Sequence, residues 1–176
     1  VYSLALETRI IREVAGNRSC GNPGDGGIGV GGLANPSGIA FDGTNLVISD
    51  TGASRLRKLT PAGALVSIAG RAPFSGDGGP AREATLFRPK MAIPDGAGGY
   101  LVADTYNCVI RRVNAQGNVS TFAGRPGVCG SPSLDIGGFA REVILNYPVA
   151  LARDRGGNVY VSEGSRVRRV AAEDSR

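Results

Sequence analysis

The sequence predicts an all-β fold: a β-propeller of four-stranded antiparallel blades, here an incomplete arc of about three blades. Its composition sets 28 glycines and 10 prolines beside 41% hydrophobic residues, a mixture typical of many short strands joined by turns. A repeat is also present, since Val14-Ala15-Gly16 recurs as Ile68-Ala69-Gly70 and as Phe122-Ala123-Gly124, at intervals of 54 residues. A period near fifty indicates a solenoid or a propeller. Each period contains four short strand-like segments, which is the unit of a propeller blade.

Other landmarks align in the same frame. Ser49-Asp50-Thr51 matches Ala103-Asp104-Thr105 after 54 residues and Ser162-Glu163 after a further 59. Pro36, Pro89 and Pro148 align as well. In the second repeat, turn residues separate the expected strands Lys90 to Pro94, Tyr100 to Ala103, Val109 to Val113 and Val119 to Ala123. The first strands of the other two repeats are expected at Ser37 to Phe41 and at Val149 to Arg153.

The repeat frame predicts one propeller domain with four parts. Residues 1–16 are expected to be the outer strands of a preceding blade, residues 17–70 and 71–124 to be blades, and residues 125–176 to be an incomplete blade. The segment Arg166 to Val170 aligns with a third strand, and no fourth strand follows it. Since propellers close with about four to eight blades, we expect this chain to be an arc of a longer protein.

The residue types present exclude several kinds of chemistry. Histidine is absent, so a histidine base or a histidine-ligated zinc or iron cannot be carried by this chain alone. No apolar run reaches the roughly eighteen residues that span a bilayer, so no membrane insertion is expected. The net charge of +5 is spread along the chain and would support nucleic-acid binding only if the arginines gathered on one face.

The stretch "RAPFSGDGGPAREATLFRP", residues 71–89, is the connector between two expected blades. A phosphate-binding loop has Lys and then Ser or Thr after its last glycine, whereas Pro80 follows Gly79 here. A calcium loop needs several oxygen ligands at alternating positions, but Asp77 stands alone. Asp25 and Asp77 are thus the candidates for a metal site that the pattern disfavours, and we expect no cofactor. Asp77 is expected to accept backbone N–H groups instead.

Two aligned stretches, "NPSGIAFDGTNLVISDTGASRLRKLTPAGALVSIAG" and "RPKMAIPDGAGGYLVADTYNCVIRRVNAQGNVSTFAG", closely resemble the NHL-repeat family. The "GDGGPA" of residues 76–81 resembles the connector of one large subgroup of that family. The resemblance covers essentially the whole chain, although the third connector reads "SLDIGGFAREVILNYP" and departs from the pattern. It implies a β-propeller, and members of the family serve as extracellular interaction modules, RNA-binding modules, sensor domains and occasionally lyases.

The three cysteines follow the repeat frame. Cys108 lies at the turn between the second and third strands, and Cys129 lies in the next connector, 21 residues on. These two connections emerge on the same face of a blade, so a disulfide is geometrically reasonable, with free thiols or a metal as the alternatives. Cys20 matches Cys129, and its partner is expected upstream of Val1. Disulfides indicate an oxidising compartment.

Two sequons point the same way. Asn17-Arg18-Ser19 lies in a connector, and Asn118-Val119-Ser120 opens an outer strand. Both are candidate N-glycosylation sites. Together with the cysteines they predict an extracellular location, as a secreted protein or an ectodomain.

Basic pairs recur in the expected third strands, and acids recur at the end of the second strands. The basic pairs are Arg57-Lys58, Arg111-Arg112 and Arg168-Arg169, and the acids are Asp50, Asp104 and Glu163. The pairs could form a stripe for RNA or an acidic polysaccharide, or they could pair with the acids. Alternation along a strand sends neighbours to opposite faces, which favours pairing. Asp50 and Asp104 are also expected to accept backbone N–H groups of the turn that follows them.

The leading hypothesis is a non-catalytic extracellular module for protein interaction or structure. Its partners would be other protein chains or the remainder of its own chain, with a polysaccharide as a further candidate. One alternative is part of a propeller enzyme of the lyase or lactonase type, whose metal ligands lie in other blades. Another is an RNA-binding propeller, which the cysteines and sequons disfavour. The partner would touch either the connector face or the opposite face, which carries the turns at 42–45, 95–99 and 153–158.

Overall fold

The computed structural model describes residues 2–5, 10–16, 25, 32–70, 76–130 and 138–172. Over these residues the strands form antiparallel sheets in which neighbours in sequence are neighbours in space. β1 (Tyr2–Ala5) pairs with β2 (Ile10–Glu13). Two sheets are four-stranded, β3 (Pro36–Phe41), β4 (Leu46–Asp50), β5 (Arg55–Leu59) and β6 (Leu65–Ala69), and β7 (Met91–Pro94), β8 (Tyr100–Asp104), β9 (Val109–Val113) and β10 (Val119–Ala123). A three-stranded sheet follows, with β11 (Pro148–Arg153), β12 (Val159–Glu163) and β13 (Arg166–Val170).

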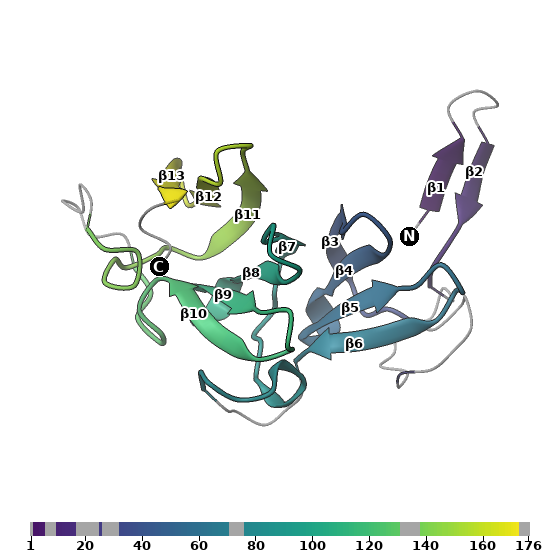
Figure 1. Cartoon of the computed structure of the whole chain (residues 1–176), viewed down its shortest axis with the longest axis horizontal. Coiled ribbons are helices and arrows are strands. Elements are labelled where there is room, and N and C mark those ends of the chain that lie inside the picture. The colour runs from purple at the N-terminus through teal and green to yellow at the C-terminus, as the bar shows by residue number, and fades with distance from the viewer. Residues whose placement is uncertain are drawn as a thin grey trace.

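The sheets stand side by side in an arc (Figure 1). The first strand of each sheet lies on the inside, because β3 packs against β7 and β7 packs against β11. The last strands, β6 and β10, lie at the outer edge of their sheets. This is the arrangement of propeller blades around an axis, and it confirms the predicted fold class and the predicted strand order of the second repeat.

Apolar cores lie between adjacent sheets. The core between the first two blades is built from Val47 and Leu56 on one side and Val102 and Val113 on the other, with Leu86 of the connector between them. The core between the second and third blades contains Leu145 in the place of Leu86. Each connector therefore inserts one buried leucine between blades, and the blades depend on their neighbours for burial.

The repeated Ala-Gly signature has a steric reason. Gly70 and Gly124 both have a φ of +92°, in the region that disfavours side chains. A Cβ at Gly70 would come within 2.3 Å of the Ser54 carbonyl oxygen, and one at Gly124 within 2.6 Å of the Cys108 carbonyl oxygen. Only glycine lets the chain leave the outer strand this close to the turn before the third strand.

The connector of residues 76–89 covers the outer edge of the blade that it enters. The Gly78 N–H donates to the Val119 carbonyl at 2.8 Å, the Val119 N–H donates to Gly79 at 3.0 Å, and the Ala81 N–H donates to Gly117 at 2.7 Å. The open edge of β10 is thereby paired, which removes a site for unwanted strand addition.

Three short 3₁₀ turns are present that the sequence reasoning did not predict, namely η1 (Thr51–Ala53), η2 (Ala81–Glu83) and η3 (Thr105–Asn107). η1 and η3 each end at a left-handed residue, Ser54 at φ +53° and Cys108 at φ +54°. Among the described residues there is no helix with the length and apolar character needed to cross a membrane.

Candidate functional site on the connector face

The blades have two faces that differ in chemistry. The connector face carries residues 34–37, 51–54, 87–90, 105–108, 125–130 and 145–149, where the connectors enter each blade and where the second strand turns into the third. The turn face carries residues 42–45, 95–99 and 154–158, which join the first and second strands. The functional features predicted from sequence fall mainly on the connector face.

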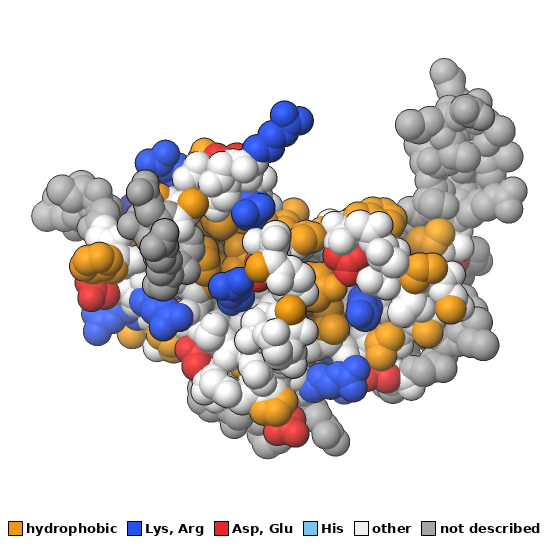
Figure 2. Space-filling view, in the orientation of Figure 1, with side chains coloured by type: hydrophobic (Ala, Val, Ile, Leu, Met, Phe, Trp, Pro, Cys, Tyr) orange, Lys and Arg blue, Asp and Glu red, His pale blue; other side chains and the backbone are white. Residues whose placement is uncertain are grey.

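A buried acid–arginine unit recurs in each blade. In the second blade, Arg111 Nη1 lies 3.8 Å from Asp104 Oδ2 and Arg111 Nη2 lies 2.9 Å from Asp77 Oδ1. Arg57 has the same relation to Asp50 and Asp25, at 3.7 and 3.3 Å. Arg168 pairs with Glu163 in the third blade. The recurring arginines thus pair with the recurring acids inside their own blades, as favoured from the sequence, and Lys and Arg are scattered over the surface seen in Figure 2.

The connector aspartates complete these units. Asp77 Oδ2 accepts the Thr121 N–H at 2.8 Å, a backbone contact of the kind expected for it. Asp25 Oδ1 accepts the N–H and the hydroxyl of Ser67 at 2.9 and 2.6 Å. Burial raises the pKa of Asp25, but the Ser67 hydrogen bonds and the charge of Arg57 outweigh burial and bring the pKa below its ordinary value. Across the described part of the chain, no group of three or more His, Cys, Asp or Glu residues could hold a metal ion.

The backbone contacts expected for Asp50 and Asp104 were assigned to the wrong segment. Asp104 Oδ1 accepts the N–H of Phe87 at 2.6 Å, and Asp50 Oδ1 accepts the N–H of Ala34 at 2.6 Å. These donors belong to the connector that enters the blade, whereas neither 3₁₀ turn receives a side-chain cap. The carboxylates therefore anchor the incoming connector. Sequence distance hid this contact, because the donor lies 16 or 17 residues upstream.

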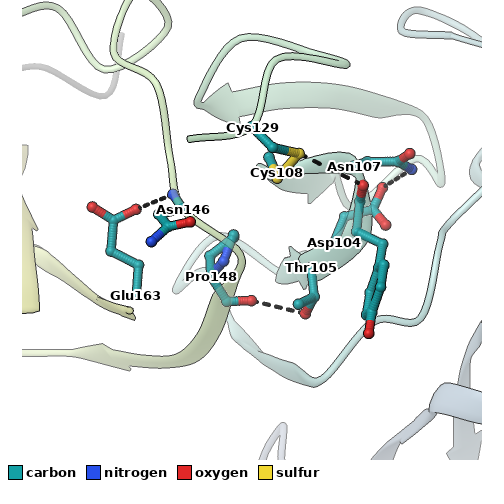
Figure 3. Close-up of a disulfide and its surroundings, with 9 residues drawn as sticks. Asp104, Thr105, Asn107, Cys108, Cys129, Asn146, Pro148 and Glu163 are labelled. Carbon is teal, nitrogen blue, oxygen red and sulfur yellow. Dashed lines mark hydrogen bonds between the residues drawn. A yellow bond between two sulfur atoms is a disulfide. The ribbon is translucent and has the colours of Figure 1, made fainter. Parts of the chain in front are cut away.

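The threonine after each of these aspartates links two blades. Thr105 Oγ1 donates to the Pro148 carbonyl at 2.8 Å, and Thr51 Oγ1 donates to the Pro89 carbonyl at 2.6 Å. Figure 3 shows the Thr105 bond together with the bond from the Asn146 N–H to Glu163. The aligned Asp-Thr and Pro landmarks are thus two halves of one contact between blades.

Burial gives Asp104 an unusual titration. It raises the pKa of Asp104 from 3.8 to about 6, against the opposing influence of Asn107, the Phe87 N–H and Arg111. The folded chain therefore protonates this group at a higher pH than the unfolded chain, and its contribution to stability falls as pH rises from about 4 to about 6.

An Asp104→Asn variant should lack this pH dependence. Between pH 4 and pH 7, the free energy of unfolding of the native chain is expected to fall by up to about 3 kcal/mol relative to that of the variant. Urea unfolding of both proteins at pH 4, 5, 6 and 7 measures the difference. A difference that stays constant across this range would show that Asp104 does not titrate in this way.

The predicted disulfide between Cys108 and Cys129 is present (Figure 3), with a Cα–Cα distance of 5.3 Å. It ties the turn after η3 to the connector that leaves the same blade. Ser54 occupies the equivalent place in the first blade with nearly the same φ. Asn17 and Cys20 lie outside the described residues. Asn118 is exposed beside β10, and its glycosylation stays a prediction.

Three exposed aromatic rings form a continuous row on the connector face. The ring centroids of Phe87 and Tyr106 lie 5.2 Å apart, and those of Tyr106 and Tyr147 lie 5.7 Å apart. The Arg88 guanidinium carbon lies 5.4 Å from the Tyr106 centroid. The exposed fractions are 47% for Phe87, 42% for Tyr106 and 47% for Tyr147. The row spans the second and third blades.

Sequence reasoning missed this row because it weighed the low aromatic content of the whole chain. The usable signal was position within the repeat. Tyr147 stands directly before Pro148, Phe87 stands two residues before Pro89, and Tyr106 lies in the turn before Cys108. All of these places belong to one face. Asn35, Arg88 and Tyr147, each before an aligned proline, have a φ between +48° and +55°, so one backbone geometry presents a different side chain in each blade.

A pocket of about 520 Å³ adjoins the row between the first and second blades. Phe87, Arg88 and Lys90 line it from the second blade. The first blade contributes Asn35, Pro36, Ser37, Thr51, Gly52 and Ser54. The lining therefore combines one aromatic ring and two cationic side chains with small polar residues, and it contains no acidic side chain.

Acids of the turn face are engaged within the chain. Asp42 Oδ2 accepts the Tyr100 hydroxyl at 2.6 Å, which joins the first and second blades. Asp95 pairs with Arg112 at 2.8 Å. Burial raises the pKa of Asp42, but hydrogen bonds from Tyr100, Asn45 and Thr44 outweigh burial and hold the pKa well below its usual range. These contacts serve the architecture of the blades.

No protein-family model matches the chain, and no curated protein matches it. Solved structures do. A protein of unknown function from Bacteroides thetaiotaomicron matches 97% of this chain with a TM-score of 0.75 at 23% identity. An auxiliary nutrient binding protein from the same organism matches 99% with a TM-score of 0.61 at 17% identity. A gluconolactonase from Xanthomonas campestris matches 73% with a TM-score of 0.51 at 19% identity.

The chain spans about two fifths of the length of the first two of these structures, 41% in each case. Their identities are low, and their names describe different activities. The likeness therefore concerns the fold and does not extend to function. Together with the four-stranded antiparallel sheets arranged in an arc, it shows that this chain has the β-propeller fold.

Proposed function

We propose that this chain is part of an NHL-type propeller that works as an extracellular protein-interaction module and binds its partner through the connector face. The observation that carries the proposal is the row of Phe87, Tyr106 and Tyr147. The three rings are each more than two fifths exposed and contact one another. Aromatic residues and arginine are enriched at the centre of protein interfaces, where they carry much of the binding energy.

The row is also supported from below. The Phe87 N–H is held by the buried Asp104 carboxylate, Tyr106 lies in the 3₁₀ turn that ends at the disulfide, and the Tyr106 N–H donates to the Phe87 carbonyl at 3.1 Å. Rings on a rigid backbone lose little conformational entropy on binding. This favours the connector face over the turn face, whose acids are already paired.

The NHL assignment and the extracellular location belong to the same proposal. The 54-residue period, the Asp-Thr landmarks and the "GDGGPA" connector support the family. The Cys108–Cys129 disulfide supports an oxidising environment. Binding proteins occur among propellers of similar fold, including the auxiliary nutrient binding protein.

Site-directed photocrosslinking tests the proposal. A photoreactive phenylalanine analogue replaces Phe87 in one protein and Thr44 of the turn face in another, and each is exposed to extracellular fluid of the source organism. We expect a defined protein adduct at position 87 and none at position 44. Excess unlabelled native chain should suppress the adduct, whereas excess Tyr106→Ala/Tyr147→Ala chain should not.

Two results would count against the proposal. Equal adducts at positions 87 and 44 would show that the connector face is not selective. An adduct destroyed by ribonuclease would identify RNA as the partner. Mass spectrometry of the adduct without reducing agent also tests the extracellular location, because a Cys108–Cys129 crosslinked peptide should be recovered.

A further inference from the structure

We infer that the pocket between the first and second blades is a binding site for a small, flat carboxylate, such as an aromatic acid. The inference is independent of the protein partner proposed above. It rests on the charge of the pocket, on the way that its space arises, and on the donors that it leaves available.

The pocket carries positive charge that the described part of the chain does not neutralise. Arg88 and Lys90 line it, and neither makes an ion pair with any described residue. The contrast with Arg57 and Arg111 is direct, because each of those pairs with two carboxylates. Two cations beside one cavity without an acidic side chain favour an anionic ligand.

The space exists because the first blade has small residues where the second has large ones. Gly52 stands at the place of Tyr106, since the N–H of each donates to the carbonyl of the matching connector residue, Ala34 or Phe87. Ser54 stands at the place of the disulfide-bonded Cys108. A Cβ at Gly52 would lie 2.5 Å from the Ala34 carbonyl oxygen, so no side chain fits there without movement of the backbone.

The cationic wall is held in place. The Arg88 guanidinium lies against the Tyr106 ring, and the Arg88 N–H donates to Ser54 Oγ at 3.4 Å. The Lys90 N–H donates to the Ala103 carbonyl at 3.1 Å. A ligand therefore meets a wall whose backbone is already ordered, which lowers the entropic cost of binding.

The donors left in the pocket select an acceptor. The hydroxyl groups of Ser37 and Thr51 donate to the carbonyls of Lys90 and Pro89, at 2.7 and 2.6 Å. Their hydrogens are therefore occupied, and the side chains of Arg88 and Lys90 remain as the charged donors. A guanidinium binds a carboxylate through two parallel hydrogen bonds, and the Phe87 ring offers an apolar surface to a flat group. The volume falls within the usual range of small-ligand pockets.

Titration with benzoate, followed by the amide resonances of the isotope-labelled chain, tests the site. Benzamide is the matched control, because it has the same shape without the charge. We expect benzoate to shift the resonances of residues 35–37, 52–54 and 87–90, and to bind about tenfold more tightly than benzamide.

Variants separate charge from shape. Arg88→Gln and Lys90→Gln should each weaken benzoate binding about tenfold, whereas Lys58→Gln, which lies at a different cavity of the molecule, should leave it unchanged. Ser54→Tyr should abolish binding by filling the pocket without removing a charge. Equal binding of benzoate and benzamide would overturn the inference, and so would unchanged benzoate affinity in Arg88→Gln/Lys90→Gln.

Discussion

Replacement of Arg111 by methionine is expected to lower the free energy of unfolding by about 3–5 kcal/mol at neutral pH. The Arg111 side chain is 6% exposed and stands between the Asp104 and Asp77 carboxylates. Methionine keeps much of the volume and removes the charge. Asp104, which is fully buried, would then be an acid without its cation, and burial of an uncompensated charge is costly. Urea unfolding followed by circular dichroism measures the loss.

A double variant identifies the cause of this loss. Adding Asp104→Asn to Arg111→Met removes the stranded charge, so the double variant should be more stable than Arg111→Met alone. The loss in Arg111→Met should also be smaller at pH 5 than at pH 7.5, because Asp104 can be neutralised by protonation at the lower pH. Arg125 is exposed, so Arg125→Met is the control and should change stability by less than about 0.5 kcal/mol. Equal losses in Arg111→Met and Arg125→Met would contradict the argument.

Removal of the disulfide by Cys108→Ser/Cys129→Ser should lower the free energy of unfolding by about 3 kcal/mol. The bond closes a loop with a sequence separation of 21 residues, and its loss enlarges the conformational freedom of the unfolded chain. Serine suits position 108, because Ser54 has a φ of +53° at the matching place and Cys108 has +54°. The loss should therefore report the crosslink itself and not a strained backbone.

Reducing agent provides the control for this prediction. Dithiothreitol should lower the thermal midpoint of the native chain toward that of Cys108→Ser/Cys129→Ser, and it should leave the midpoint of the variant unchanged. If the reduced native chain unfolds at the same temperature as the oxidised chain, the disulfide contributes nothing to stability. The rings of Phe87, Tyr106 and Tyr147 lie beside this bond, so the reduced chain also shows whether the aromatic row depends on it.

The strand pattern was predictable because it depends on local chemistry. The strands expected at Val109 to Val113 and Val119 to Ala123 have the same bounds in the structure. Short alternating segments and turn residues act within a few positions, so the chain itself carries this signal. The Cys108–Cys129 pair was predictable for a related reason, since the repeat frame placed both residues on one face.

The sequence by itself determined the fold class, the blade period and the pairing of the recurring acids and arginines, because these features repeat every 54 residues. Only the tertiary structure decided which connector N–H groups Asp50 and Asp104 hold, and which side chains gather on the connector face. Phe87, Tyr106 and Tyr147 come from two connectors and a turn, and the pocket beside them depends on Gly52 and Ser54 of another blade. Such neighbours are set by the packing of blades around an axis, which places residues far apart in sequence side by side without leaving a local pattern.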